Sequence, residues 1–320
     1  MLAEGLQKRG WDVTLICHPG STCPVDIIPL HLRKGDALSR LRNAAKVAQC
    51  VITGGYDIIH SFAHFDLTAG FWPTFRRQIQ SFQAPPHPEA FAKRINLLPR
   101  KNVWFTTCGH HMVKNYQHLS PTRGIHNGVI TDDFAFKQTV EEDAPFVFLG
   151  RIEPIKGTHL AIDIAEAAGR KLVIAGNRSA STELASYFKD EIEPRLSDKV
   201  TYVGPVNDQE KSKLLGESAA LLMPIQWDEP FGIVMAEALA CGTPVIGTNR
   251  GALPEIVQHG VTGFCCDSVE EMIGAAGMIA KLSRQDCRLA VETRFASDMI
   301  IDQYVALYEE ILNFDNSTAA

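Results

Sequence analysis

The segment EPFGIVMAEALACGTPVIGT, residues 229–248, encodes a helix and a strand joined by a glycine turn. Pro230 and Gly232 interrupt the chain directly before the apolar run 233–240, whose residues suit a buried helix. The run TPVIGT (243–248) then has the length and the β-branched content of a buried strand. A helix followed at once by such a strand is typical of a domain built on a parallel sheet.

Four apolar segments upstream have the same character. Each is short, ends at a glycine, a proline or a polar turn, and precedes a helical pattern, which predicts further strands of a parallel sheet. Ligands bind beyond the ends of the strands in sheets of this kind. The four segments are FVFLG (146–150), KLVIAG (171–176), KVTYVG (199–204) and ALLMPI (220–225).

The N-terminal part of the chain shows the same alternation. Residues 36–52 predict a helix, and the Pro-rich run 84–91 predicts a loop. Because both parts of the chain alternate in this way, we expect an α/β fold with two Rossmann-like domains that face each other across a cleft. The runs that predict N-terminal strands are 12–17, 25–32, 57–62 and 103–107.

The first element of the chain is a helix rather than a strand. Leu2 and Leu6 lie at helical spacing before Gly10, and a strand follows at once. A doubly wound domain normally opens with a strand, a Gly-rich loop and a helix. We interpret the start as lacking that first strand and loop; the alternative is a fold that begins with a helix.

The bulk composition is that of an ordinary globular protein. The 320 residues suffice for two domains of about 150 residues each, and the net charge of −6 argues against a general nucleic-acid binder. No run approaches the roughly 18 uncharged apolar residues of a membrane span. The eight cysteines form no C-x-x-C pair, so we expect reduced thiols, no metal site and a cytoplasmic location, with peripheral contact to a membrane left open.

Two carboxylates flank the N-terminus of the helix in the opening segment. Glu229 lies in the loop ahead of the helix, and Glu237 lies about a turn and a half into it. The free N–H groups around residues 232–234 form an anion site suited to a diphosphate. Carboxylates accept hydrogen bonds from vicinal hydroxyls, so one glutamate can hold a sugar and the other a ribose.

A basic loop follows the first strand of the C-terminal series. In FLGRIEPIKGTHLAI (148–162) the strand ends at Gly150 and a helix begins after Gly157, with Arg151 and Lys156 between them. Two cations at a strand end can neutralise a departing phosphate without a metal ion.

Two further turns lie where a hinge or a ligand contact is expected. Asn127–Gly128 is a turn dipeptide near the predicted domain junction. In TYVGPV (201–206) a strand ends at Gly204–Pro205, where exposed backbone groups can hydrogen-bond a nucleobase edge.

These motifs together resemble those of glycosyltransferase family 4, whose members have the GT-B fold and include sucrose-phosphate synthases and bacterial mannosyl- and glucosyltransferases. The run EPFGIVMAE followed by GTPVIGTNRGALPEIVQHGVTGF is highly specific, and GRIEPIKG is a second match. HNGV, with Asp132 and Phe134, matches the family's interdomain segment. The resemblance is dense over residues 123–312 and looser before them.

The resemblance implies a donor site residue by residue. Glu229 corresponds to the glutamate that touches the donor sugar, and Glu237 to the one that holds the ribose hydroxyls. Arg151 and Lys156 correspond to the basic pair on the diphosphate, which makes them catalytic residues together with Glu229. The other implied donor contacts are Gly150, Phe231, Gly232, Ile233 and Val234 around the sugar and phosphate, and Val203 and Gly204 at the base.

The acceptor side departs from the family pattern. Members usually carry a histidine at the end of the strand before the Pro-rich region, where this chain reads QIQSFQAP and Gln83 takes the place. His87 lies four residues on, and His60 and His64 end an earlier strand; which of them substitutes stays open. Gln83, His87 and Asn127 are the acceptor-side candidates.

The resemblance also predicts the domain organisation. Residues 1–135 are expected to form an acceptor-side Rossmann-like domain that lacks its first strand. Residues 136–296 are expected to form the domain that binds the nucleotide sugar. Residues 297–320 are expected to form a helix that crosses back to the N-terminal domain, followed by a frayed tail.

The expected activity is retaining transfer of a hexose from a nucleotide-diphosphate sugar, without a metal ion or other cofactor. The acceptor is an unidentified small molecule, glycan or lipid-linked compound; no nucleic acid partner and no transmembrane segment are expected. Two alternatives stay open: a catalytically impaired remnant that binds nucleotide sugars, and a GT-B nucleotide-sugar epimerase. Isomerisation of a sugar without any acceptor would favour the epimerase.

Overall fold

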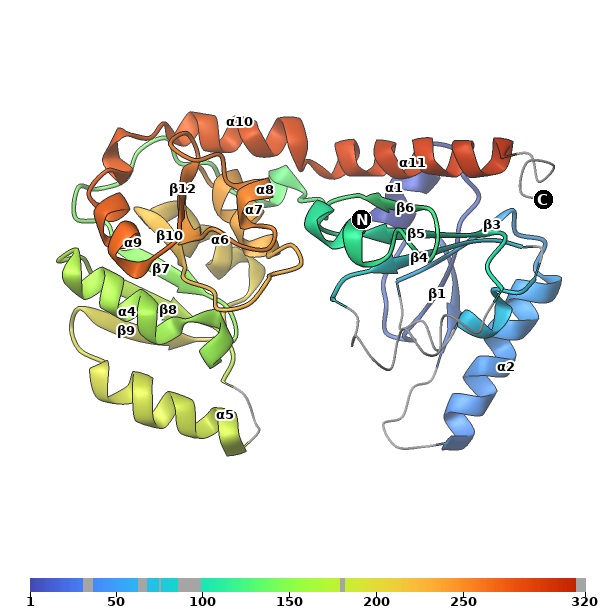
Figure 1. Ribbon diagram of the computed structural model, residues 1–320, viewed down its shortest axis with the longest axis horizontal. Helices are drawn as coiled ribbons and strands as arrows, with labels where there is room; N and C mark the ends of the chain where they lie inside the picture. The colour runs from blue at the N-terminus through green and yellow to red at the C-terminus, as the bar shows by residue number, and fades with distance from the viewer. Residues whose placement is uncertain (31–36, 63–67, 75, 86–98, 179–181, 315–320) are drawn as a thin grey trace. The chain divides into compact units, whose positions relative to one another are not determined.

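The predicted alternation of strands and helices is present in two separate parts of the chain. The computed structural model describes residues 1–30, 37–62, 68–74, 76–85, 99–178 and 182–314 (Figure 1). By its contacts the chain divides into one unit of Met1–His126 with Ser297–Ala320 and a second of Asn127–Ala296. Both units are built on parallel strands flanked by helices, which confirms the predicted α/β class.

The unit Asn127–Ala296 contains a six-stranded parallel sheet in the order β12-β11-β10-β7-β8-β9. The first strand of the series, β7, lies beside β10 at the centre, and the chain adds strands outward in both directions. The junction of β7 and β10 is therefore the switch point at which such sheets bind ligands. The strands are β7 (Phe146–Leu149), β8 (Leu172–Ala175), β9 (Val200–Gly204), β10 (Ala220–Met223), β11 (Val245–Thr248) and β12 (Gly263–Cys266).

Helices cover both faces of this sheet. Phe146 and Phe148 point to the face covered by α4 and α9, where they join the main hydrophobic core of the unit. The alternate strand residues face the opposite side, where α7 packs between α6 and α10. Strands covered on both faces must be apolar throughout, as the sequence shows. The helices are α4 (Thr158–Ala167), α5 (Thr182–Tyr187), α6 (Asp208–Glu217), α7 (Ile233–Ala240), α8 (Leu253–Ile256), α9 (Val269–Ala276) and α10 (Arg284–Arg294).

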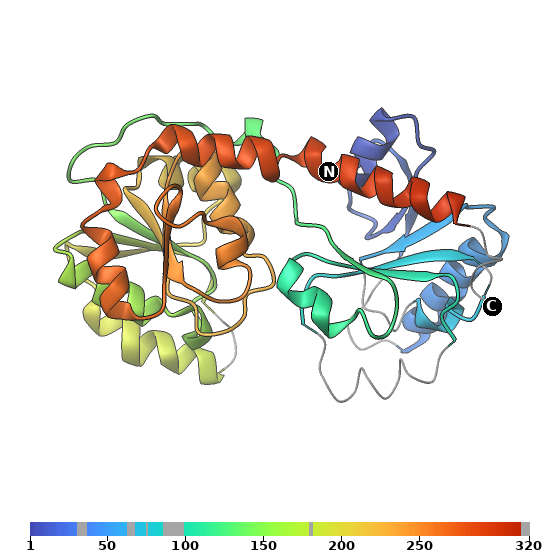
Figure 2. The same cartoon turned by 45° about the horizontal axis from the view of Figure 1, so that its top comes forward.

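The other unit has a four-stranded parallel sheet in the order β3-β4-β5-β6 and a parallel pair β1-β2. Ile79 and Trp104 of the larger sheet pack with α1 and α11 in one apolar cluster, and both views show α11 running beside α1 (Figures 1 and 2). The strands are β1 (Thr14–Cys17), β2 (Asp26–Pro29), β3 (Ile58–Ser61), β4 (Arg77–Phe82), β5 (Val103–Thr107) and β6 (Thr122–Gly124), and the helices are α1 (Leu2–Lys8), α2 (Ala37–Thr53) and α11 (Ser297–Asn313).

The C-terminal helix belongs to the N-terminal unit by its contacts. Arg9, just after α1, donates to the side chain of Asp302 on α11 at 2.7 Å, and Tyr304 and Tyr308 of α11 are buried against the sheet. At the other junction, Asn127 and the eight residues after it group with the C-terminal unit.

Candidate active site

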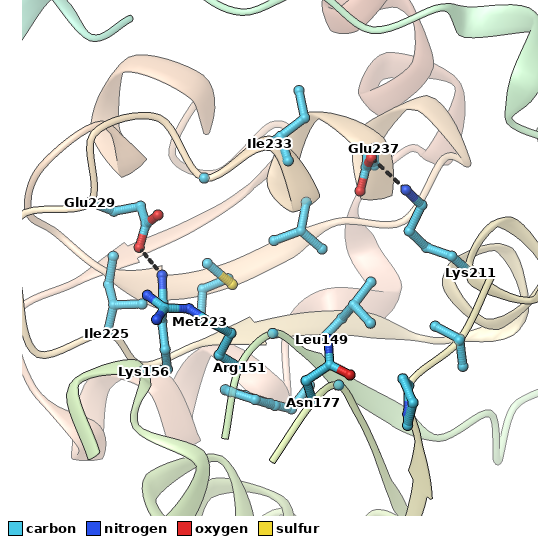
Figure 3. Close-up of a pocket in the computed structure, with 17 residues that line it drawn as sticks. Leu149, Arg151, Lys156, Asn177, Lys211, Met223, Ile225, Glu229, Ile233 and Glu237 are labelled. Atoms are coloured by element: carbon cyan, nitrogen blue, oxygen red, sulfur yellow. Dashed lines mark hydrogen bonds and ion pairs between the residues drawn. The ribbon is translucent and has the colours of Figure 1, made fainter. Parts of the chain in front are cut away.

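A pocket of about 340 Å³ lies at the carboxyl ends of the strands of the second unit (Figure 3). Its volume is at the lower end of the roughly 300–1,000 Å³ typical of small-molecule sites. The pocket straddles the switch point, because its walls come from the loops that follow β7 and β10 and from the adjoining helix α7. It is lined by Phe148, Leu149, Gly150, Arg151, Lys156, Gly176, Asn177, Pro205, Val206, Lys211, Met223, Ile225, Glu229, Gly232, Ile233, Val234 and Glu237.

The N-terminus of α7 opens onto this pocket. Gly232 precedes the helix in the left-handed region, with φ of 71°, and a Cβ atom there would lie 2.7 Å from the Cε atom of Met235 and 3.0 Å from the Cγ atom of Glu229. Only glycine adopts this left-handed backbone conformation without strain and also leaves the space that a Cβ atom would occupy. Ile233 and Val234 begin the helix and line the pocket, so their N–H groups and the helix dipole favour an anion there.

Two backbones approach each other closely in the lining of the pocket. Gly176, after β8, has φ of 142°, and a Cβ atom on it would meet the carbonyl oxygen of Gly150 at 1.8 Å. The backbones after β7 and β8 can approach this closely only because position 176 carries no side chain.

Glu229 is held by two donors. Nζ of Lys156 donates to its Oε2 atom at 2.5 Å, and Nε1 of Trp227 donates to the same oxygen at 2.8 Å. The ammonium of Lys156 also lies 5.0 Å from the centroid of the Trp227 ring. These three side chains form one charged and hydrogen-bonded cluster that orients Glu229 in the pocket wall.

Arg151 is the more exposed cation of the basic loop. Its Nη1 atom donates to Oε1 of Glu153 at 2.7 Å, and 60% of its side chain is exposed against 8% for Glu153. Lys156 ends the 3-10 turn Pro154–Lys156, which Gly157 follows, and both Lys156 and Arg151 line the pocket.

Glu237 has its own cation at the other end of the pocket. Nζ of Lys211, from α6, donates to Oε1 of Glu237 at 2.8 Å. Figure 3 shows this pair well separated from Lys156 and Glu229, with Ile233 between them. The pocket therefore carries a carboxylate paired with a lysine at each end, and a helix N-terminus in its wall.

The structure brings eight of the predicted donor residues into one pocket. The other three predicted residues do not line this pocket. Phe231 is 2% exposed and packs against Phe295 with a centroid distance of 6.0 Å. Val203 is 52% exposed and Gly204 is partly buried, and the pocket wall beyond β9 consists of Pro205 and Val206 instead. The eight that line the pocket are Gly150, Arg151, Lys156, Glu229, Gly232, Ile233, Val234 and Glu237.

Three polar residues of the site are absent from the sequence-based prediction: Asn177, Lys211 and Trp227. Asn177 follows directly after the predicted strand that ends at Gly176, so the rule that ligands meet strand ends identifies it. Trp227 lies two residues before Glu229. Lys211 lies in a helix with several charged residues, and nothing in the local pattern separates it from its neighbours.

The acceptor-side candidates lie elsewhere. Gln83 directly follows β4 and is exposed, and Asn127 is partly buried at the start of the second unit. His87 and His64 fall outside the described residues.

His60 has a structural environment. Its Nδ1 atom lies 2.6 Å from the hydroxyl of Tyr308, and its Nε2 atom lies 2.6 Å from Oγ of Ser81. Burial lowers the pKa of His60 to about 3. With both ring nitrogens engaged, His60 links α11 to β3 and β4.

Residues 129–294 match the family model for glycosyl transferases group 1. The chain belongs to this family of glycosyltransferases. It is 33% identical over 131 residues to N-acetyl-alpha-D-glucosaminyl L-malate synthase of Bacillus anthracis, which covers 38% of this chain and 33% of that protein. It is 33% identical over 163 residues to D-inositol 3-phosphate glycosyltransferase of Mycobacterium avium, which covers 46% of this chain and 38% of that protein. The chain thus aligns with less than half the length of each relative.

Solved structures match over nearly the whole chain. AviGT4, a glycosyltransferase involved in avilamycin A biosynthesis, is 26% identical with a TM-score of 0.70 over 98% of this chain and 88% of that one. Sucrose-phosphate synthase from Thermosynechococcus elongatus is 19% identical with a TM-score of 0.76 over 97% of this chain and 91% of that one, a likeness of fold. These matches confirm the predicted GT-B fold.

Helices make up much of the part of the chain that the structure describes. None of the helices there combines the length and the apolar character that crossing a bilayer requires.

Proposed function

We propose that this protein is a retaining glycosyltransferase of family 4 that transfers a hexose from a nucleotide-diphosphate sugar to an acceptor hydroxyl without a metal ion. The observation that carries the proposal is the arrangement of the pocket, in which Lys156–Glu229 and Lys211–Glu237 flank the N-terminus of α7. A diphosphate suits the helix N-terminus, and a carboxylate at each end suits the hydroxyls of a sugar and of a ribose.

The proposed orientation places the donor sugar near Glu229 and the ribose near Glu237. Glu229 lies in the loop ahead of α7 beside Lys156, whereas Glu237 lies inside the helix beside Lys211. When the diphosphate of a donor binds at the helix N-terminus, its sugar can reach Glu229 and its ribose can reach Glu237 in the same binding mode. Glu229 and Glu237, with seven residues between them, resemble the pair of glutamates in family 4, which supports the same direction.

In the proposed reaction the bond between the sugar C1 atom and the diphosphate oxygen breaks, and a bond from the acceptor oxygen to C1 forms on the same face. The acceptor proton passes to the leaving phosphate, and the products are a glycoside and a nucleoside diphosphate. Negative charge grows on the leaving oxygen as the bond breaks. Lys156, Arg151 and the N–H groups of Ile233 and Val234 are the groups that stabilise it.

Charge balance supports the metal-free part of the proposal. In the structure Lys156 and Arg151 are paired with Glu229 and Glu153, so the cations sit at the pocket with their charges partly neutralised. A diphosphate competes for the same cations, and its binding frees the carboxylates to accept sugar hydroxyls. The two cations and the helix N-terminus supply the positive charge that a divalent metal supplies in other transferases.

The acceptor is proposed only as a class: a small molecule, a glycan or a lipid-linked compound with a reactive hydroxyl. The names of two relatives refer to L-malate and to D-inositol 3-phosphate. Both compounds carry hydroxyls and negative charge, so they belong in the first panel of acceptors.

The experiment incubates the protein in EDTA with UDP-, GDP- and ADP-hexoses, with and without the acceptor panel. We expect one nucleoside diphosphate to be released faster with an acceptor present, and NMR of the product to show the anomeric configuration of the donor. Release that strictly needs added Mg²⁺ contradicts the metal-free mechanism, and an inverted product contradicts retention. Sugar isomerisation without acceptor would establish an epimerase instead.

A further inference from the structure

Lys211 and Glu237 form a partly buried ion pair in the pocket wall (Figure 3). Nζ of Lys211 lies 2.8 Å from Oε1 of Glu237, and 19% and 11% of the two side chains are exposed. Among the eight residues of α7, Glu237 is the one charged residue, and the helix is buried from Met235 to Ala240. A carboxylate in such apolar surroundings either keeps a partner, takes up a proton or turns toward solvent.

Lys211 is itself held from several sides. It lies in the first turn of α6, which begins with a capping box between Asn207 and Glu210. Its ammonium also pairs with Asp208 at 3.0 Å and lies 5.5 Å from the centroid of the Phe134 ring. Burial alone would lower the pKa of Lys211, but the hydrogen bonds to Glu237 and Asp208 outweigh burial and raise it. Lys211 is therefore a fixed cation.

The pair leaves half of the carboxylate for a ligand. Lys211 occupies Oε1 of Glu237. Within the described part of the chain, Oε2 of Glu237 accepts no hydrogen bond from the protein, and Glu237 lines the pocket. A carboxylate whose first oxygen is fixed presents its second oxygen in one direction, which suits recognition of a hydroxyl at a defined place.

We propose that Lys211 is a positioning residue that orients Glu237 to accept the ribose hydroxyls of a ribonucleoside diphosphate, and that it thereby makes the site prefer ribose to deoxyribose. This inference rests on the function proposed above. Lys211 acts through Glu237, so removing the lysine should damage recognition of the ribose more than recognition of the diphosphate, which lies toward Lys156.

The test is a calorimetric comparison of the nucleoside diphosphate that binds best with its 2′-deoxy analogue. The wild-type protein should prefer the ribonucleotide by about tenfold or more, as expected for a hydrogen bond to a charged group. Lys211→Met should bind the ribonucleotide more weakly and lose most of this preference. Lys211→Arg, which keeps a cation, should retain more of the preference than Lys211→Met.

A matched control comes from the same helix. Lys213 is exposed on α6, two residues beyond Lys211, and Lys213→Met should behave as the wild type in both titrations. Thermal unfolding of each variant shows whether the unit has kept its fold, and Lys211→Arg keeps the test available if Lys211→Met unfolds.

A double-mutant cycle separates action through Glu237 from a direct contact. If Lys211 acts through Glu237, then Lys211→Met combined with Glu237→Gln should lose no more affinity than Glu237→Gln alone. Additive losses overturn the inference, and so does an unchanged preference for ribose in a folded Lys211→Met protein. A wild-type protein that binds no nucleoside diphosphate overturns the proposed function itself. If the wild type binds the ribonucleotide and its 2′-deoxy analogue with equal affinity, the inference about Lys211 and the ribose is wrong, while the proposed function stands.

Discussion

The Nζ atom of Lys156 lies 2.5 Å from Oε2 of Glu229, although the two residues are 73 positions apart in the chain. The two side chains are 14% and 11% exposed. Lys156 comes from the loop after β7 and Glu229 from the loop after β10, the two strands that meet at the switch point of the sheet. This contact joins the cation proposed for the diphosphate to the carboxylate proposed for the sugar.

Lys156→Met should lower turnover by about 10²–10³, the usual loss when one stabilising donor is removed from a site of developing negative charge. The variant also leaves Glu229 without its buried cation, so the donor KM should rise. Initial rates at several donor concentrations measure both effects. Lys199→Met, at an exposed position outside the pocket, is the control and should match the wild type. Turnover of Lys156→Met equal to that of the control would contradict the role.

Trp227→Phe removes the hydrogen bond to Glu229 and keeps an aromatic ring near Lys156. Because Glu229 is proposed to contact the sugar and not the nucleotide, kcat/KM for the nucleotide sugar should fall roughly tenfold or more. Affinity for the free nucleoside diphosphate should stay unchanged. Calorimetry of the nucleotide beside steady-state kinetics makes the comparison. Equal losses in both measurements would show that Trp227 supports the whole pocket and not the sugar end.

Arg284 of α10 is a buried cation that ties several chain segments together. Its guanidinium donates to the carbonyl oxygens of Lys137, Gly216 and Ser218 and to Oγ1 of Thr243, at 2.7–3.0 Å. Burial lowers the pKa of Arg284. These bonds link the C-terminal end of α6 to the segment leading into β11 and to Lys137, which precedes β7.

Arg284→Met should leave these oxygens without donors and lower the free energy of unfolding by about 2–4 kcal/mol. The melting temperature should fall by on the order of 10 °C in a unit of this size. Gln285→Met, at the exposed neighbouring position on α10, is the matched control. Differential scanning calorimetry measures the melting temperatures. If Arg284→Met melts at the same temperature as the wild type, water replaces the arginine without a loss of stability.

His60 predicts a pH dependence of stability. Its folded-state pKa is lowered to about 3 by burial, and its unfolded-state pKa is about 6.5. Between these values the unfolded chain binds a proton that the folded chain does not. The stability contributed by neutral His60 is therefore complete above pH ~6.5 and falls by up to about 1.4 kcal/mol per pH unit as the pH drops through this window.

Melting temperatures of the wild type, His60→Gln and His118→Gln across this pH range test the assignment. His60→Gln should flatten the acid side of the profile of the N-terminal unit, because glutamine has no charge to gain. His118 is exposed, and His118→Gln should keep the wild-type slope. Identical slopes in all three proteins would assign the acid sensitivity to other groups.

The elements with clear boundaries were predictable from the sequence. The helix predicted at 233–240 is α7, with the same bounds, because Gly232 starts it and Gly242 follows its end. The helix predicted at 36–52 is α2, Ala37–Thr53, and the helix predicted within 297–320 is α11, Ser297–Asn313. The strands β6 and β12 were not predicted. β6 has only three residues, and β12 lies inside a motif whose glycines indicate turns.

The site was predictable where its residues lie next to a strand end or a helix start. Glu237, inside α7, was instead predictable from its place in the run EPFGIVMAE. Arg151, Lys156 and Glu229, which line the pocket with it, do satisfy the condition. Lys211 does not, because only the packing of α6 against α7 brings it to Glu237. A contact between two helices depends on their crossing, and the pattern within either helix does not reveal it.

The pocket is proposed to bind a nucleoside diphosphate without a metal ion. Calorimetric titration of the wild type and of Glu237→Ala with UDP, GDP and ADP in EDTA tests it most directly. We expect at least one nucleotide to bind the wild type in EDTA and added Mg²⁺ to leave its affinity unchanged. Glu237→Ala should bind that nucleotide at least about tenfold more weakly. Failure of all three nucleotides to bind would contradict the proposed donor site, and equal affinity of Glu237→Ala would contradict the role of Glu237.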